Sequence, residues 1–588
     1  MPDTLDRLPF DILFYIILHL DFDDLVSLAY TCKQLKTLLN ENSICKKIIQ
    51  TRFPYSKKAQ LAQNQHISYP QAFNHIQDRR NAFSNAHPFS ARIVGKANDF
   101  CYRQGKLCIL KGNVISVLDS ISKDVIINLS TISPGSWASS EELRLSLLFY
   151  NDDIVTVYCK KEGRPNNGHI LAISIRPGLP DEDRLIKSIP LEDTRKLFAR
   201  HTSQYLYYGT YSSVGPQGHD EWEIRGVSLD VNRTMPRDSL KLRGFFGTDV
   251  GSTIAFEIHN DAFCAVSNQT TFEVEEIDWT SFYHCIKFPL HDPTPAAMES
   301  NRNLWRRQHD EGVLQDSWTD LSLQIDEATH SLMIVEARRE YQKTCHQQVR
   351  TFYISEFVSS PDSSIPSSEA LTGLVLPWDD AYVATLDSTN NPNYARPEPR
   401  NNWNFHPEVP FKSNPNRSFL LARTKLRAYN YSCASFLDMV EDDRCCHLSE
   451  SCLRLRIGSR RVAPLDWRPL EESMPERLSA PALSGDVAYR HSKVKMWPPP
   501  SSRCPCSKRL HQILNPPLPS GPAYNRSITG TLDEDNLVYM IRPGQSYNPS
   551  DDKALGIIVM TNFNQAALPP KILCSNESIN KKNTDLSG

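Results

Sequence analysis

The chain has 588 residues, of which 40% are hydrophobic and 9% aromatic, a composition typical of a folded protein and not of a wholly disordered one. Lys and Arg number 65 against 68 Asp and Glu, so the net charge of -3 gives no general attraction to nucleic acid or to an anionic membrane. At this length the chain can hold a small module and at least one large domain.

The sequence shows neither a membrane-spanning run nor the features of a signal peptide. No apolar run approaches the roughly 18 to 20 residues of a membrane-spanning helix. The apolar stretch from Leu13 to Leu20 follows Asp3, Asp6 and Asp11, whereas a signal peptide begins with basic residues. The 15 cysteines are scattered and odd in number. We therefore expect a protein of a reducing compartment, cytoplasmic and/or nuclear, with no membrane association.

The first fifty residues predict a compact helical segment. Pro9 suits the first turn of a helix, where its missing N–H is not needed. Apolar residues then follow at helical steps on two faces: Ile12, Leu13, Ile16, Ile17 and Leu20. Asp21 indicates the start of a second helix, with Asp24 as an acid in its first turn. A unit this small is marginal on its own, so a helix with two apolar faces needs a second surface to cover it.

The order of these residues resembles the F-box, a three-helix module that docks its protein onto Skp1 in cullin-RING ubiquitin ligases. The resemblance covers roughly residues 5 to 52 and rests on Leu8-Pro9-Phe10-Asp11-Ile12-Leu13, Asp24-Leu25-Val26-Ser27-Leu28 and Thr31-Cys32-Lys33-Gln34-Leu35. It implies an F-box at residues 1–54 whose Skp1-binding and local core residues are Leu8, Pro9, Ile12, Leu13, Ile16, Leu20, Leu25 and Leu28. Where F-boxes commonly carry a Trp before a basic residue, this chain has Ile44-Cys45-Lys46. The alternative is an ordinary helical cap on the main domain.

Beyond this segment the spacing of the apolar residues changes. Residues 55–97 predict a helical linker, and from residue 98 short strand-like runs recur around turns such as Asn151-Asp152-Asp153 and His259-Asn260-Asp261. Strand, tight turn and strand in succession are typical of antiparallel meanders. We expect residues 98–575 to form an all-β domain, with loop insertions near 359–417 and 464–524 and a disordered tail at 576–588.

A propeller is the favoured architecture, because radial packing of meanders leaves only short protected edges. The spacing predicts roughly six to eight blades. A large sandwich or two smaller β domains remain alternatives. The units resemble the divergent propeller-like domains that follow fungal F-boxes, on segments such as Trp318-Thr319-Asp320-Leu321-Ser322-Leu323. The expected fold class is therefore a three-helix F-box followed by an irregular β-propeller.

Candidate chemistry is sparse. Cys445, Cys446, His447 and Cys452, with Cys504-Pro505-Cys506 later, are the one metal-like group, but their spacing does not follow the C-x₂₋₄-C pairs of zinc sites. No phosphate loop, nucleophile elbow or dinucleotide motif is present. The run Trp305-Arg306-Arg307-Gln308-His309, next to Asp310-Glu311, is interpreted as a solvated loop rather than a binding surface. We expect no metal, no cofactor and no catalytic residues.

The resemblance implies a substrate-recognition subunit of a Skp1-cullin-F-box E3 ubiquitin ligase that does no chemistry itself. Its partners would be Skp1, through it a cullin-RING ligase, and an unknown protein substrate bound by the β domain, with no nucleic acid and no membrane. Two alternatives stay open. One is a Skp1-binding scaffold outside ubiquitination, and the other is a β-propeller enzyme whose N-terminal helices cap the domain.

Overall fold

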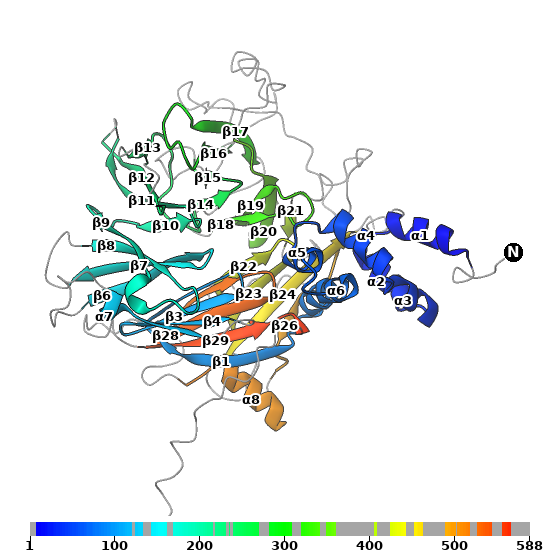
Figure 1. Ribbon diagram of the computed structural model, residues 1–588. Helices are drawn as coiled ribbons and strands as arrows, with labels where there is room; N and C mark the ends of the chain where they lie inside the picture. The colour runs from blue at the N-terminus through cyan, green and yellow to red at the C-terminus, as the bar shows by residue number, and fades with distance from the viewer. Residues whose placement is uncertain are drawn as a thin grey trace, which may run out of the picture.

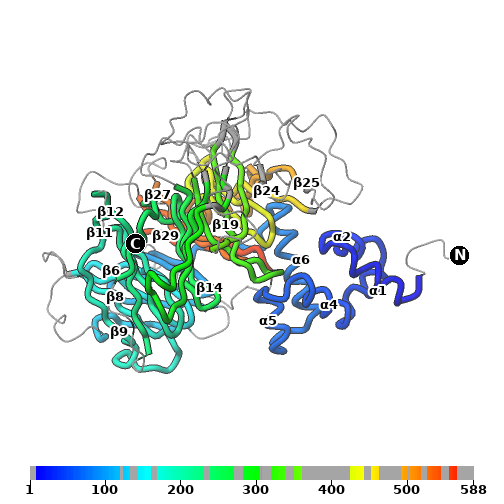
Figure 2. The backbone as a smooth tube through the Cα atoms, turned by 90° about the horizontal axis from the view of Figure 1, so that it is seen from above, coloured from blue at the N-terminus to red at the C-terminus, as the bar shows by residue number. Residues whose placement is uncertain are grey.

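A helical segment at the N-terminus lies beside a ring of β-sheets (Figures 1 and 2). The computed structural model describes residues 8–119, 124–132, 143–161, 168–215, 218–230, 235, 239–269, 281–307, 319–341, 348–359, 405–407, 424–442, 452–462, 489–500, 502–517, 526–543 and 555–565. None of the described helices is both long and apolar enough to cross a membrane.

Six helices form the N-terminal segment. They are α1 (Phe10–His19), α2 (Phe22–Ala29), α3 (Lys33–Leu39), α4 (Asn42–Arg52), α5 (Lys57–Gln63) and α6 (Tyr69–Asn85). Four of them lie within the expected F-box, one more than the three expected, because the chain after Thr31 forms the short helix α3 before α4 begins. Helix α6 starts with a capping box, in which Ser68 and Gln71 each bond the other's backbone N–H.

The described strands form seven antiparallel sheets, and this confirms the predicted propeller with a blade count inside the expected range. The first sheet contains β2 (Asp99–Arg103), β3 (Lys106–Lys111), β4 (Val114–Asp119) and β5 (Val125–Asn128), and the second contains β6 (Leu143–Asn151), β7 (Ile154–Lys161), β8 (Gly168–Ser174) and β9 (Leu185–Leu191). The third sheet contains β10 (Phe198–His201), β11 (Tyr205–Val214), β12 (Asp220–Ser228) and β13 (Leu240–Leu242). The fourth contains β14 (Ile254–His259), β15 (Ala262–Ser267), β16 (Ser281–Pro289) and β17 (Glu299–Arg307).

The remaining three sheets complete the ring. The fifth sheet contains β18 (Asp320–Ile325), β19 (Leu332–Tyr341), β20 (Gln348–Glu356) and β21 (Phe405–Pro407). The sixth contains β22 (Thr424–Asn430), β23 (Ser435–Asp442), β24 (Cys452–Val462) and β25 (Tyr489–His491), and β26 (Lys495–Trp497) also pairs with β24. The seventh contains β27 (Arg526–Leu532), β28 (Asn536–Pro543), β29 (Gly556–Asn562) and β1 (Ser90–Ala97). Two short helical turns, α7 (Leu129–Ile132) and η2 (Asp181–Asp183), lie between strands.

Short turn residues set the hairpins that the sequence predicts. Asp152 and Asp153 join β6 to β7 with φ of 47° and 60°, and Asn260 and Asp261 join β14 to β15 with φ of 48° and 55°. Asn and Asp tolerate this left-handed conformation, which two-residue hairpin turns require. The local turn chemistry therefore fixes the register of these pairs.

Strand β1 closes the ring in a way that local patterns do not indicate. It pairs antiparallel with β29, so one sheet combines residues 90–97 with three strands from the C-terminal part of the chain. The helical segment consequently ends at Asn85, and the expected linker boundary at residue 97 falls at the end of a propeller strand. Residues 90–97 are strand because β29 offers them an unpaired edge.

The second expected insertion, 464–524, also contains regular structure. Strands β25 and β26 pair with β24, and helix α8 (Pro505–Leu514) packs beside β1 and β24. Proline suits the first turn of α8, whereas the sequence reading took the proline content as a loop signal. The insertion at 359–417 lies outside the described residues apart from Ser359 and β21, and so does the tail at 576–588.

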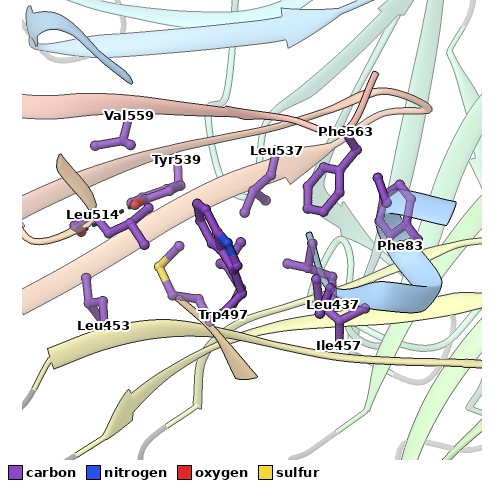
Figure 3. Close-up of a cluster of buried hydrophobic side chains, with 14 of the residues drawn as sticks. Phe83, Leu437, Leu453, Ile457, Trp497, Leu514, Leu537, Tyr539, Val559 and Phe563 are labelled. Carbon is purple, nitrogen blue, oxygen red and sulfur yellow. Dashed lines mark hydrogen bonds between the residues drawn. The ribbon is translucent and has the colours of Figure 1, made fainter. Parts of the chain in front are cut away.

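The hydrophobic core is divided among the interfaces between neighbouring sheets. One of these clusters joins the sheets of β22–β26 and β27–β29 to helices α6 and α8 (Figure 3). Phe83 of α6 stacks on Phe563 with ring centroids 4.2 Å apart, and both side chains are fully buried. Helix α6 is therefore part of the core of the propeller as well as of the helical segment.

Candidate functional site

Helix α1 begins where the sequence predicts. Pro9 is its N-cap, and the Pro9 carbonyl accepts the backbone N–H groups of Ile12 and Leu13, both at 3.1 Å. Asp11 lies in the first turn and His19 in the last, so each end carries the side chain that the helix dipole favours. The helix is apolar at most of its ten positions.

The two faces of α1 have different environments. Leu13 and Ile17 are buried, and Ile17 belongs to a helical core shared with Phe22, Leu25 and residues of α4 and α6. On the opposite face Ile12 is 48% exposed and Tyr15 66%, and Phe10, at the start of the helix, is 49% exposed. Three large apolar side chains exposed on one short helix are typical of an interaction surface.

The structure separates the eight predicted docking residues by exposure. Pro9 and Ile12 are exposed, and Leu13 and Leu25 are buried. Half-buried positions are Leu8, Ile16, Leu20 and Leu28. Tyr15 belongs to the same exposed face as Ile12, and Phe10 is exposed at the start of the helix, although neither is among the eight predicted residues. Because α1 is apolar nearly all round, its periodicity could not distinguish the outer face from the inner one.

An arginine holds the corner between the first two helices. Asp21 is the N-cap of α2, but its carboxylate makes no capping bond and instead accepts from Arg52 Nη1 at 3.3 Å. Arg52 Nη2 also donates to the carbonyls of Leu18 and Leu20. The end of α4 is thus fixed to the end of α1, and this orients the exposed face.

The Ile44-Cys45-Lys46 departure leaves no gap in the helical core. Ile44 and Cys45 are fully buried, and the Cys45 thiol donates to the Leu39 carbonyl at 3.0 Å. Burial raises the pKa of Cys45 to about 12, so the thiol stays protonated and inert. Lys46 lies over the ring of Tyr69, 5.8 Å from its centroid.

Buried ion pairs connect the helical segment to the propeller. Arg79 of α6 donates to both carboxylate oxygens of Glu327 in the β18–β19 turn, at 3.1 and 2.9 Å, and to Glu534 in the β27–β28 turn at 3.3 Å. Lys58 of α5 pairs with Asp535 at 3.0 Å. Burial alone lowers the pKa of Arg79, but Glu327 and nearby carboxylates outweigh it and raise the pKa well above its ordinary value.

Further contacts reach the same face of the propeller. Arg80 donates to both oxygens of Asp23, at 3.2 and 2.7 Å, and to the Ser432 carbonyl at 2.8 Å. Tyr55 donates its backbone N–H to the Glu327 carbonyl, and its ring stacks on His330. The F-box is therefore held rigidly at one side of the ring, next to β18–β26 (Figure 2).

The innermost strands carry a charged cluster across the ring. Arg103 of β2 makes a bidentate pair with Glu257 of β14, with distances of 3.0 and 2.9 Å. The guanidinium groups of Arg103 and Arg200 each lie 4.6 Å from the ring of Phe149. These groups satisfy one another and join the strands of different sheets.

Most of the predicted metal-like group lies outside the described residues, namely Cys445, Cys446 and His447. Cys452 is half-buried at the start of β24. Among the described residues, no group of three or more His, Cys, Asp or Glu side chains is placed to hold a metal ion. Arg306, interpreted from sequence as part of a solvated loop, is instead buried and pairs with Glu336 at 2.8 Å, because a buried carboxylate on β19 faces it.

Comparison with known proteins adds a family for the helical segment and neighbours for the ring. Residues 5–47 match the F-box domain family, and no curated protein matches the chain. The solved structures similar to it include the WD40 domain of SCAP from fission yeast (TM-score 0.30, 7% identity, 79% of this chain and 83% of that chain). Another is prolyl oligopeptidase B from Galerina marginata (TM-score 0.27, 8% identity, 80% of this chain and 57% of that chain).

These structural likenesses are too weak to carry an argument about function, and the propeller is assigned from the strand pairing itself. The F-box match coincides with the helices whose outer face is apolar and exposed. The chain therefore carries an F-box domain at residues 5–47, followed by a seven-bladed β-propeller-like domain.

Proposed function

We propose that this protein is a substrate-recognition subunit of a Skp1-cullin-F-box E3 ubiquitin ligase. In this role the F-box binds Skp1 and the propeller binds a target protein, while the ubiquitin chemistry belongs to other subunits. The protein would then be a non-catalytic adaptor of the cytoplasm or nucleus, acting in ubiquitin-dependent degradation by proximity and effective concentration.

The observation that carries this proposal is the exposed face of α1. Ile12 and Tyr15 project from the side of α1 opposite the buried Leu13 and Ile17, and Phe10 is exposed at the start of the helix, so these side chains contribute little to folding. Their exposure costs the free protein hydrophobic free energy, on the order of 25 cal/mol for each Å² of apolar surface left in water. A partner that covers this face recovers that free energy.

The rigid junction supports the same role. Helix α6 belongs to the hydrophobic cores of both the F-box and the propeller, and Arg79 and Lys58 add ion pairs between them. A target on the propeller would thus stand at a fixed distance from Skp1. Fixed geometry raises the effective concentration of the target at the ligase beyond that of a flexible tether.

Binding to purified Skp1 tests the proposal. The double variant Phe10→Ala with Ile12→Ala removes two exposed apolar anchors and should weaken binding by more than about 2 kcal/mol, roughly thirtyfold in Kd. The matched control is Ile126→Ala with Val214→Ala, which truncates side chains that are 68% and 67% exposed on the propeller. The control should bind like the wild type.

Several outcomes distinguish the alternatives. Equal Skp1 binding by the α1 variant and the wild type would refute the role of this face. Skp1 binding without recruitment of a cullin would favour a scaffold outside ubiquitination. The double variant Leu8→Ala with Pro9→Ala should lose Skp1 as well, since it removes the start of the same helix.

A further inference from the structure

Two cysteines lie at the exposed start of helix α8. Cys504 is the N-cap of the helix, Pro505 is its first residue and Cys506 its second. Both thiols are free and exposed, whereas the other cysteines in the described part of the chain are buried or half-buried. Since a thiol reacts with a dissolved molecule only where that molecule can reach it, these two are the cysteines best placed for such a reaction.

The backbone of Pro505 sets the separation of the two cysteines. The distance between the Cα atoms on either side of a residue depends on the φ and ψ of that residue, and Pro505 has the conformation of a first helical residue. Helix geometry, with a Cα radius of about 2.3 Å and a rise of about 1.5 Å, places such Cα atoms about 5.4 Å apart. Disulfides span roughly 4.4–6.8 Å between Cα atoms. The pair can therefore be bridged while α8 keeps its fold.

The N-cap conformation turns the Cys504 side chain toward the first turn of α8. Its φ of -61° and ψ of 129° are extended and not helical. An N-cap side chain in this conformation lies near the N–H groups of the second and third helical residues, here Cys506 and Ser507. Although the thiol makes no capping hydrogen bond, the N–H groups of Ser507 and Cys506 stabilise its thiolate and lower the pKa of Cys504, and the Cys506 thiol contributes to this effect.

Hydrogen bonds hold this turn in place. The backbone N–H of Cys504 donates to the Ser502 hydroxyl at 3.3 Å, and the N–H of Ser502 donates to the Ser507 hydroxyl at 3.2 Å. The Cys504 carbonyl accepts the N–H of Lys508 at 3.1 Å. At its other end α8 is anchored by Leu514, which is buried in the core of the propeller. The two thiols are thus presented from a fixed helix and not from a free loop.

We propose that Cys504 and Cys506 form a reversible disulfide by exchange with a small disulfide of the glutathione class. A disulfide in a protein of a reducing compartment is usually transient and redox-sensing, which suits an exposed pair of this kind. Exposed disulfides are also the ones that are reduced again most easily. The start of α8 would then be reduced at rest and oxidised when the small disulfide accumulates.

The exchange has two steps. The Cys504 thiol gives its proton to solvent, and its thiolate attacks one sulfur of glutathione disulfide, whose S–S bond breaks; the released glutathione thiolate takes up a proton. The Cys506 thiol then loses its proton and attacks the Cys504 sulfur. This breaks the mixed disulfide and releases a second glutathione, which is protonated in turn. Two protein thiols are oxidised, and one glutathione disulfide is reduced to two glutathione molecules.

The experiment treats the full chain with glutathione disulfide, traps the remaining thiols by alkylation and maps the peptides by mass spectrometry. The peptide that holds Cys504 and Cys506 should lose the mass of two hydrogen atoms and regain it with dithiothreitol. Cys32 is an internal control, because it is also a helix N-cap with a partly exposed thiol but is followed two residues later by Gln34. Its reaction should stop at the mixed disulfide with glutathione.

Two variants separate the roles of the thiols. Cys506→Ser removes the thiol that resolves the mixed disulfide, so Cys504 should accumulate with one glutathione attached. Cys504→Ser removes the attacking thiol and should slow the reaction at this site by about fivefold or more, since the thiolate is the nucleophile. Both substitutions lie at exposed positions, and circular dichroism should show an unchanged fold.

The proposal is independent of Skp1 binding and can fail by itself, since the Phe10→Ala with Ile12→Ala variant should form the same disulfide as the wild type. It would be overturned if wild-type Cys504 and Cys506 each carried a glutathione and formed no internal disulfide. No reaction at Cys504 under conditions that modify Cys32 would overturn it as well. Equal reaction rates in Cys504→Ser and in the wild type would exclude Cys504 as the attacking thiol.

Discussion

Replacing Arg79 by Met tests how the F-box is held on the propeller. The Arg79 side chain is 1% exposed and its partner Glu327 is 7% exposed, so the variant leaves a carboxylate buried without its cation. Met keeps the aliphatic volume of the arginine stem, and the change therefore acts mainly on charge. Breaking a buried pair from one side typically costs about 3–5 kcal/mol.

The free energy of unfolding of Arg79→Met should fall by that amount. Most of the loss should come from Glu327, because Glu534 is more exposed and lies farther from the guanidinium. The double variant Arg79→Met with Glu327→Gln should recover most of the loss, since no charge then remains buried alone. The assay is urea unfolding followed by fluorescence, together with limited proteolysis between the helices and the propeller. Arg195→Met, in an exposed pair, is the control and should not change stability measurably.

Two results would refute this reasoning. One is an Arg79→Met variant within about 1 kcal/mol of the wild type, which would mean that the pair is solvated in solution. The other is a double variant no more stable than the single one, which would mean that the loss comes from packing and not from an unpaired carboxylate.

Other consequences follow from the same contacts. Phe83→Ala should cost about 3–5 kcal/mol by opening the shared core, whereas Phe89→Ala, at a side chain that is 41% exposed, should be nearly neutral in the same urea assay. Burial lowers the pKa of His201 from 6.5 to about 4, so the unfolded chain binds a proton at a higher pH than the folded protein does. The free energy of unfolding of the wild type should therefore fall by up to about 3 kcal/mol as the pH falls from 7 to 4. His201→Leu should lack that component, and equal pH dependence in both proteins would exclude it. A chelator should leave the melting temperature unchanged, and elemental analysis should find no stoichiometric zinc; one zinc per chain lost together with the fold would contradict this.

The sequence by itself determined the features that depend on near neighbours. The F-box segment could be recognised because Pro9, the aliphatic steps after it and Asp21 lie within a few helical turns of one another. The hairpins around Asp152 and Asn260 could be predicted because two-residue turns need specific residue types. A succession of such hairpins was sufficient to favour a propeller.

The outer face of α1 was decided by tertiary packing. The helix has apolar side chains on most of its sides, and only packing against Phe22 and the later helices buries Ile17 while Ile12 stays exposed. For this reason the sequence predicts the inner and the outer residues of α1 as one set. Exposure depends on what covers a residue, and no local pattern contains that information.

The closure of the ring and its junction with the F-box were likewise decided by the tertiary structure. Strand β1 pairs with β29 at the other end of the chain, and Arg79 meets Glu327 across 248 residues. Short hairpins close small loops and follow from adjacent residues, whereas these contacts require the whole ring to bring distant edges and charges together.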